Sequence, residues 1–101
     1  MSADRWPFED PSNHVTFTTT QVFEQTEPIL HVVHDEDGHW QFLGSTAGAL
    51  ENAKVIALHE AVDLDPSVLQ LAELPVGWQA VRESVKGPWK REAIDDATRT
   101  V

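Results

Sequence analysis

The residues best suited to chemistry are grouped in one short segment, His31 to Trp40, which reads HVVHDEDGHW. Imidazole nitrogens and carboxylate oxygens are common ligands of zinc and similar divalent ions. If this segment folds as two strands joined by a turn, His34 and His39 flank that turn on neighbouring strands. A direct cross-strand pair would bring both imidazoles to one ion, with Asp35 or Asp37 as a third ligand. His34 and His39 are therefore candidate metal ligands, and a small metal-dependent hydrolase centred on them is one hypothesis.

The same turn has a second explanation that needs no ion. Asp-Glu-Asp-Gly is favourable turn chemistry, because short acidic side chains bond to nearby backbone N–H groups and glycine adopts left-handed conformations. Elsewhere no serine lies in a nucleophile elbow, cysteine is absent, and the glycines match neither a Walker loop nor a dinucleotide fingerprint. The sequence therefore predicts no cofactor, and we expect a protein that is not an enzyme.

Charge narrows the classes of partner. The formal net charge is −10, with 13 acidic and 2 basic residues in residues 1–81 and 4 acidic and 5 basic residues in residues 82–101. An acidic surface repels nucleic-acid phosphates and anionic lipid headgroups, so we expect neither nucleic-acid nor membrane binding. A basic protein is the partner that this charge favours, and Asp35, Glu36 and Asp37 are the candidate contact residues.

The four tryptophans fall into two groups. Trp40 and Trp78 lie on predicted strands and are expected in the core. Trp6 and Trp89 lie in irregular segments beside prolines, where an exposed indole would anchor an interface. Trp6 is therefore added to the candidate partner-binding residues, although both terminal tryptophans have the alternative role of covering a sheet edge.

Strand-forming segments and turn signals alternate along the chain. Strands are predicted at 15–18, 29–34, 39–44, 54–58 and 78–84. One short helix is predicted after the capping box that begins at Thr18, and a second after the N-cap Asp65 and Pro66. This order indicates an α+β fold with a mostly antiparallel sheet of about four or five strands and short helices on one face.

The length of 101 residues predicts a single domain, 1–101. Two prolines make residues 1–14 an extended arm that packs Trp6 and Phe8 back onto the domain. Residues 90–101 lose apolar periodicity and are expected to fray. The chain contains no long apolar run and no signal peptide, and the lack of cysteine suits a reducing compartment, so a cytoplasmic protein is expected.

The parity of strand pairing assigns faces to the central hairpin. A turn of two or four residues would place Ile29, His31 and Val33 on one face with Trp40 and Phe42. The residues that alternate with these along the two strands, including His34 and His39, would share the opposite face. The metal hypothesis depends on this register.

Two ordered segments, TQVFEQTEPILHVVHDEDGHWQFLG and VIALHEAVDLDPSVLQLAELPVGWQAVRES, resemble a family of small bacterial proteins of unknown function, some described as immunity-protein-like domains. The resemblance implies a bacterial, cytoplasmic α+β interaction domain that binds and neutralises a toxin. It brings no catalytic or ligand residues to this chain. Three hypotheses therefore stand: a binding module for a basic partner, the hydrolase, and a structural or regulatory homo-oligomer.

Overall fold

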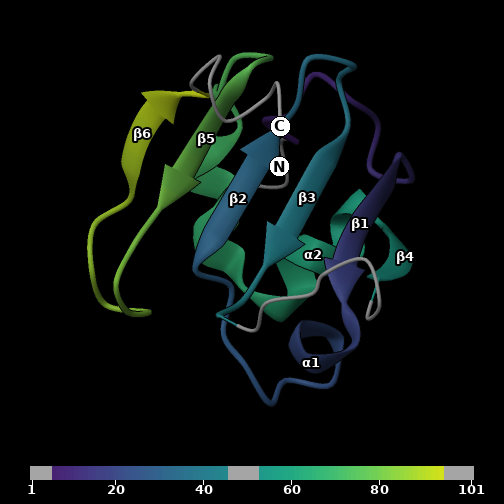
Figure 1. The fold of residues 1–101 in the computed structure, drawn as a ribbon. Coiled ribbons are helices and arrows are strands. Elements are labelled where there is room, and N and C mark those ends of the chain that lie inside the picture. The colour runs from purple at the N-terminus through teal and green to yellow at the C-terminus, as the bar shows by residue number, and fades with distance from the viewer. Residues whose placement is uncertain (1–5, 46–52, 95–101) are drawn as a thin grey trace.

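One sheet organises the protein, and its strands come from most of the length of the chain (Figure 1). The computed structural model describes residues 6–45 and 53–94, and in these residues the sheet has six strands in the order β4-β1-β3-β2-β5-β6. The strands are β1 Val15–Thr19, β2 His31–His34, β3 Trp40–Leu43, β4 Ala53–Ala57, β5 Trp78–Val81 and β6 Lys90–Ala93. β1 runs parallel to β3, and the other neighbouring pairs are antiparallel. The predicted α+β class and mostly antiparallel sheet are confirmed, with six strands in place of four or five.

The additional strand is β6, which lies where the sequence predicts a frayed tail. Its four residues are all exposed, so no apolar periodicity marks them as a strand. Backbone pairing with β5 holds β6 in place, and the Gln79 amide donates a hydrogen bond to the Glu92 carboxylate across the pair. The structure thus differs from the prediction at residues 90–93, while residues 1–5 of the arm and 95–101 of the tail lie outside the described residues.

Three short helices pack on one face of the sheet: α1 Thr20–Phe23, α2 Leu58–Leu64 and the 3-10 helix η2 Pro66–Leu71. The N-cap of α1 is Thr19, whose hydroxyl accepts a hydrogen bond from the Val22 N–H at 3.2 Å. The predicted cap at Thr18 is wrong by one residue, because the Thr18 hydroxyl donates to the Phe42 carbonyl at 2.6 Å. Thr18 therefore remains in the sheet.

The start of η2 follows the predicted signals. Asp65 is the N-cap, and its carboxylate accepts a hydrogen bond from the Ser67 N–H at 3.0 Å, while Pro66 occupies the first helical position. Proline is tolerated there because that N–H has no partner within the helix. Val68 and Leu71 are buried, as the apolar spacing of this segment predicts.

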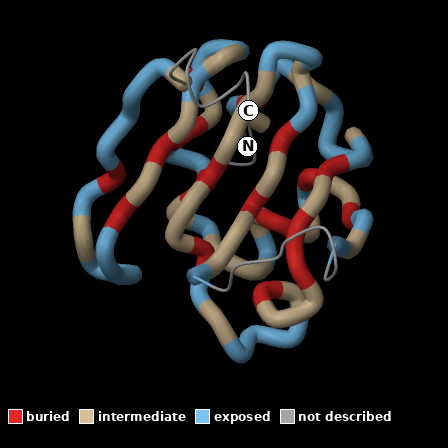
Figure 2. The backbone as a smooth tube through the Cα atoms, viewed as in Figure 1, coloured by how far each residue is buried: buried red, intermediate tan, exposed pale blue. Residues whose placement is uncertain are grey.

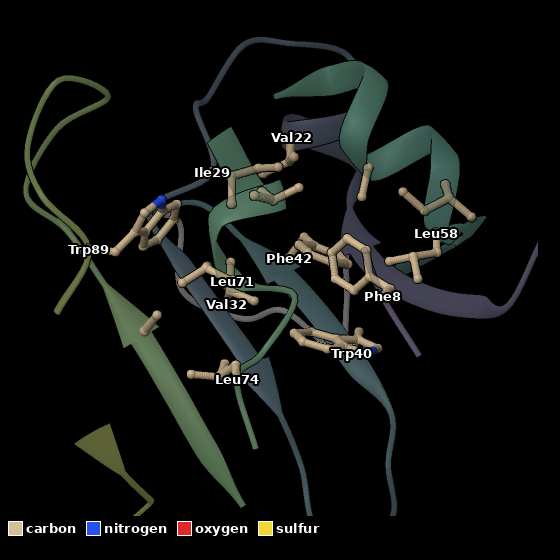
Figure 3. Close-up of a cluster of buried hydrophobic side chains, with 14 residues drawn as sticks. Phe8, Val22, Ile29, Val32, Trp40, Phe42, Leu58, Leu71, Leu74 and Trp89 are labelled. Carbon is tan, nitrogen blue, oxygen red and sulfur yellow. The ribbon is translucent and has the colours of Figure 1, made fainter. Parts of the chain in front are cut away.

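The core lies between these helices and the sheet (Figures 2 and 3). Side chains from the arm, the sheet and the helices meet there; the buried hydrophobic residues are Phe8, Val22, Ile29, Val32, Trp40, Phe42, Ile56, Leu58, Ala61, Val68, Leu71, Leu74, Ala80 and Trp89. Trp89 therefore belongs to the core and is not an exposed anchor. Trp40 is buried as expected.

The arm joins this core through aromatic contacts. Phe8 is buried, and its ring lies 5.3 Å from the Trp40 ring in an edge-on arrangement and 5.3 Å from the Trp6 ring. Asp10 ties the two indoles together, because its carbonyl accepts from Trp6 Nε1 at 2.7 Å and its carboxylate accepts from Trp40 Nε1 at 3.0 Å. The described part of the arm is thus fixed at both indoles.

The turn between β2 and β3 has an odd number of residues, which reverses the predicted faces. Asp35 and His39 pair through a hydrogen bond from the Asp35 N–H to the His39 carbonyl at 3.0 Å. Glu36, Asp37 and Gly38 form the loop between them, and Gly38 has a φ of 88°. A three-residue loop with a left-handed glycine is a common hairpin connection, and it shifts the pairing by one residue relative to a two- or four-residue loop.

The resulting register pairs His34 with Trp40 and Val32 with Phe42. These four residues therefore share the core face. His31 and Val33, which the sequence predicts beside Trp40, lie on the opposite face. The face assignment made from the sequence is therefore wrong for β2 and β3, whereas Ile29, which precedes β2, shares the core with Trp40 and Phe42 as predicted.

Candidate functional site

The candidate site is the β2–β3 turn, at the upper edge of the sheet in Figure 1. Asp35 organises it, because one carboxylate oxygen accepts hydrogen bonds from the Asp37 N–H at 2.9 Å and the His39 N–H at 3.0 Å. This is the side-chain turn geometry that favours aspartate at the start of a tight loop. The loop residues Glu36 and Asp37 are exposed and add two acidic residues at this end of the sheet.

His34 and His39 do not form the cross-strand pair on which the metal hypothesis depends. The His34 ring is stacked on Trp40 with ring centroids 3.9 Å apart. Its Nδ1 lies 2.7 Å from the Leu74 carbonyl and must donate to it, since a carbonyl oxygen only accepts. His39 is on the opposite face beside Phe17. A hydrolase centred on the two histidines is therefore not supported.

A different group brings possible ligands together in this turn. One ligand atom each from Asp35, Asp37 and His39 lies within 4.8 Å of the others. Carboxylates and imidazole suit several divalent ions. However, Asp37 and His39 are exposed, and the Asp35 oxygen is already used by two backbone N–H groups. We interpret the group first as a turn that concentrates negative charge.

An apolar loop lies against the acidic turn. The Gly77 N–H donates to the His34 carbonyl at 2.7 Å, and a Cβ built at Gly77 would lie 3.8 Å from Glu36 Cγ. On either side of this glycine, Val76 is 51% exposed and Trp78 is 36% exposed. The sequence predicts Trp78 in the core, but it is the first residue of β5 and its side chain is partly exposed.

We call Asp35, Glu36, Asp37, Val76 and Trp78 the tip surface. It combines three carboxyl side chains with an exposed indole and an exposed valine. Trp6, the aromatic contact predicted from sequence, is half-buried, and its ring and N–H make contacts within the protein. Trp78 is therefore the better aromatic candidate.

A buried arginine at the end of β5 is the residue that sequence reasoning missed. The Arg82 side chain is 2% exposed. Its guanidinium donates to the Ile29 carbonyl at 3.1 and 2.8 Å, to Ser67 Oγ at 3.0 Å and to the Val85 carbonyl at 3.2 Å. It also pairs with the Asp65 carboxylate at 2.5 Å. The five N–H groups of the guanidinium therefore have acceptors, and the residue is structural.

Trp89 completes this arrangement, because the Arg82 guanidinium lies over its ring at 4.1 Å from the centroid. Stacking on an indole is a favourable environment for a desolvated cation. The one sequence signal for this burial is parity, since Arg82 follows Ala80 at the core-facing spacing of β5. A hollow of about 740 Å³ lies beside these residues, but the guanidinium offers it no remaining donor.

The pairing also sets the ionisation of Asp65. Burial opposes the charged form, but hydrogen bonds from Ser67 and Arg82, together with the Arg82 charge, outweigh it and lower the pKa of the Asp65 carboxyl. A carboxyl whose folded pKa is lowered stabilises the fold above its unfolded pKa. That contribution is lost as the pH falls through the folded value. The affected window lies below about pH 4, given a usual aspartate pKa of about 3.9.

We therefore expect Asp65→Asn to be less stable than the parent near neutral pH, with the difference narrowing below about pH 4. Urea unfolding at a series of pH values measures this difference. Asp63→Asn is the control, since the Asp63 side chain is 79% exposed. A difference between Asp65→Asn and the parent that does not change with pH would contradict the pairing.

Comparison with protein-family models, with curated proteins and with solved structures finds no match for this chain. The resemblance to an immunity-protein-like family therefore stays a prediction. No helix among the described residues is both long enough and apolar enough to cross a membrane.

Proposed function

We propose that this protein is a non-enzymatic binding module that engages a basic protein partner through the tip surface. The observation that carries the proposal is the hydrogen bond from the Gly77 N–H to the carbonyl of His34, which precedes the acidic turn, together with the exposure of Val76 and Trp78 on either side of Gly77. Interfaces commonly combine such an aromatic anchor with a charged rim. A toxin of basic charge is the partner that the family resemblance suggests.

The two components of the tip surface have different tasks. Carboxylates at the end of an acidic chain attract a positively charged partner and raise the association rate, an effect that salt screens. Trp78 supplies a large, rigid contact area at a small cost in side-chain entropy. Its ring can also accept a lysine or arginine of the partner in a cation–π contact. The affinity for the partner then depends both on the carboxylates and on Trp78.

Neutralising the turn is expected to weaken capture of the partner strongly. The triple variant Asp35→Asn, Glu36→Gln and Asp37→Asn removes three negative charges. The amide that Asp35→Asn introduces keeps a carbonyl oxygen as the acceptor that the turn requires. We expect basic proteins captured from the native cell lysate by the immobilised parent to fall at least about tenfold with the variant, since each buried charge pair is worth about 1.5 kcal/mol or more.

The control carries the same charge change at exposed positions away from the turn, Glu24→Gln, Asp63→Asn and Glu83→Gln. It should retain capture. Equal losses in both triple variants would show that only net charge matters. Full retention in both would reject the tip surface as the contact.

A further inference from the structure

A cavity of about 380 Å³ lies at the end of the sheet where β2 begins. Four segments form its wall: α1, the α1–β2 connection, the α2–η2 junction and the β5–β6 connection. Small-molecule sites commonly have volumes of roughly 300 to 1,000 Å³. The tip surface lies where β2 ends, so a ligand in this cavity is independent of the proposed protein partner.

Most of the cavity wall is apolar. Val22 and Ile29 contribute buried side chains, which lie next to each other in Figure 3. Leu64, Pro66 and Val85 add further apolar surface, and Val85 is 53% exposed. An aliphatic chain of several carbons would bury apolar area against these side chains, and such burial favours the binding of small ligands.

The polar side chains of the wall offer hydrogen-bond acceptors. Glu27 and Asp65 contribute carboxylates, and Gln25 contributes a carboxamide oxygen. Among the described residues, no lysine, arginine or histidine belongs to this wall. The larger hollow at the β5–β6 connection differs, because Arg82 and Lys90 place cations in its wall. A cavity with carboxylates and without a cation favours a positively charged ligand.

Asp65 is a fixed and ionised part of this wall. One carboxylate oxygen accepts from the Ser67 N–H at 3.0 Å, and the other pairs with Arg82. Although burial opposes the charged form, these hydrogen bonds and the Arg82 charge lower the pKa of the Asp65 carboxyl, so it is charged near neutral pH. The Asp65 side chain is 21% exposed, and a carboxylate has about four acceptor positions. Asp65 can therefore accept a further hydrogen bond from a ligand.

Gln25 has a backbone conformation that glycine usually supplies. Its φ is 66°, and it is the one non-glycine residue of the described chain with a positive φ. It follows α1, where the Gln25 N–H donates to the Val22 carbonyl and the Thr26 N–H donates to the Gln21 carbonyl, both at 2.9 Å. Glycine avoids the steric cost at this position. Strained residues are concentrated at functional sites, and Gln25 lines the cavity.

We propose that this cavity binds a primary aliphatic amine, with the alkyl chain against Val22 and Ile29 and the ammonium at the carboxylates of Glu27 and Asp65. A primary ammonium has three N–H donors and no acceptor, which suits a wall whose polar side chains are two carboxylates and one carboxamide. Hydrogen bonds between charged groups are stronger than those between neutral groups. A free amine and the side chain of a lysine share this chemistry.

The test is a titration of the full-length, isotope-labelled chain with hexylamine, followed by nuclear magnetic resonance. We expect saturable shifts at the backbone amides of Val22, Gln25, Ile29 and Val85, with a dissociation constant of about 1 mM or lower. Hexanol and hexanoate have alkyl chains of similar length without the positive charge, and they should bind at least about tenfold more weakly. The higher affinity of hexylamine or of N-acetyl-lysine methylamide distinguishes a free amine from a lysine side chain as the natural occupant.

Two variants separate the charge of the wall from its conformation. Glu27→Gln should weaken hexylamine binding at least about tenfold, whereas Glu24→Gln, at an exposed position outside the wall, should leave it unchanged. Gln25→Gly should raise the urea midpoint of unfolding, because it removes the left-handed strain, and should also weaken hexylamine binding. Circular dichroism establishes that each variant folds. If Glu27→Gln does not fold, the comparison of hexylamine with hexanol and hexanoate decides.

The proposal is overturned if hexylamine produces no saturable shift at about ten times the expected dissociation constant. Shifts at the tip surface in place of the cavity would also overturn it, because the amine would then follow the general acidity of the chain. Equal affinity for hexanol would show that the carboxylates are not used. Unchanged binding in Glu27→Gln, or in Gln25→Gly, would likewise contradict the assignment.

Discussion

Replacing Arg82 with methionine is expected to lower the free energy of unfolding by about 3 to 5 kcal/mol. Methionine keeps much of the aliphatic bulk, so the change tests the hydrogen bonds more than the volume. Those bonds connect Arg82 to three separate parts of the chain: Ile29 in the segment before β2, the start of η2 and the β5–β6 connection. Removing the donors leaves several carbonyl and carboxylate oxygens without partners, and that is the main cost.

Arg91→Met is the matched control for this measurement. Arg91, in β6, also donates to a backbone carbonyl, that of Gln70, but it is exposed. Its replacement should change stability by about 0.5 kcal/mol or less. Urea unfolding of both variants gives the comparison. A loss of under about 1 kcal/mol for Arg82→Met would show that desolvation of the guanidinium cancels its hydrogen bonds.

The second large effect is expected at Phe8, which ties the N-terminal arm to the core. Phe8→Ala should cost about 3 kcal/mol, because the ring is buried between the indoles of Trp6 and Trp40 and its loss opens a cavity. The arm also supplies backbone acceptors for α2, since the His14 carbonyl accepts from the Leu58 N–H. Loosening the arm therefore exposes the start of that helix.

Phe23→Ala is the control, because Phe23 is half-buried at the margin of the core and should cost about half as much. Near-ultraviolet circular dichroism adds a second readout. The packed indoles of Trp6 and Trp40 should lose signal in Phe8→Ala and keep it in Phe23→Ala. Equal stability losses with an unchanged aromatic signal would contradict the docking of the arm.

Local signals predict the parts of the fold that local chemistry determines. Asp65 followed by Pro66 is a favourable N-cap and first helical position, and runs of β-branched or aromatic residues bounded by turn residues mark β1, β2 and β3. The α+β class follows from the order of those elements. The burial of Trp40 is predictable because its large aromatic side chain lies on a predicted strand.

The sequence-based predictions fail where contacts between residues far apart in the sequence determine the structure. The loop length of the β2–β3 turn depends on one left-handed glycine, Gly38, and a change of one residue moves every hairpin side chain to the other face. The acidic turn is located correctly from sequence, but Val76 and Trp78 come from the loop before β5 and from the start of β5, about forty residues later. Arg82 is missed because its acceptors lie up to 53 residues away in sequence.

The exposed edge strand β6 has a consequence for how the sheet ends. An edge strand offers unpaired backbone groups to any other strand, and uncontrolled pairing there leads to aggregation. Lys90, Arg91 and Glu92 place charge along this edge, and all of β6 is exposed. β6 lacks the apolar periodicity by which a strand is recognised in a sequence, and the charged residues that it has instead also protect the edge. The strand ends the sheet, and its charges disfavour pairing with a further strand.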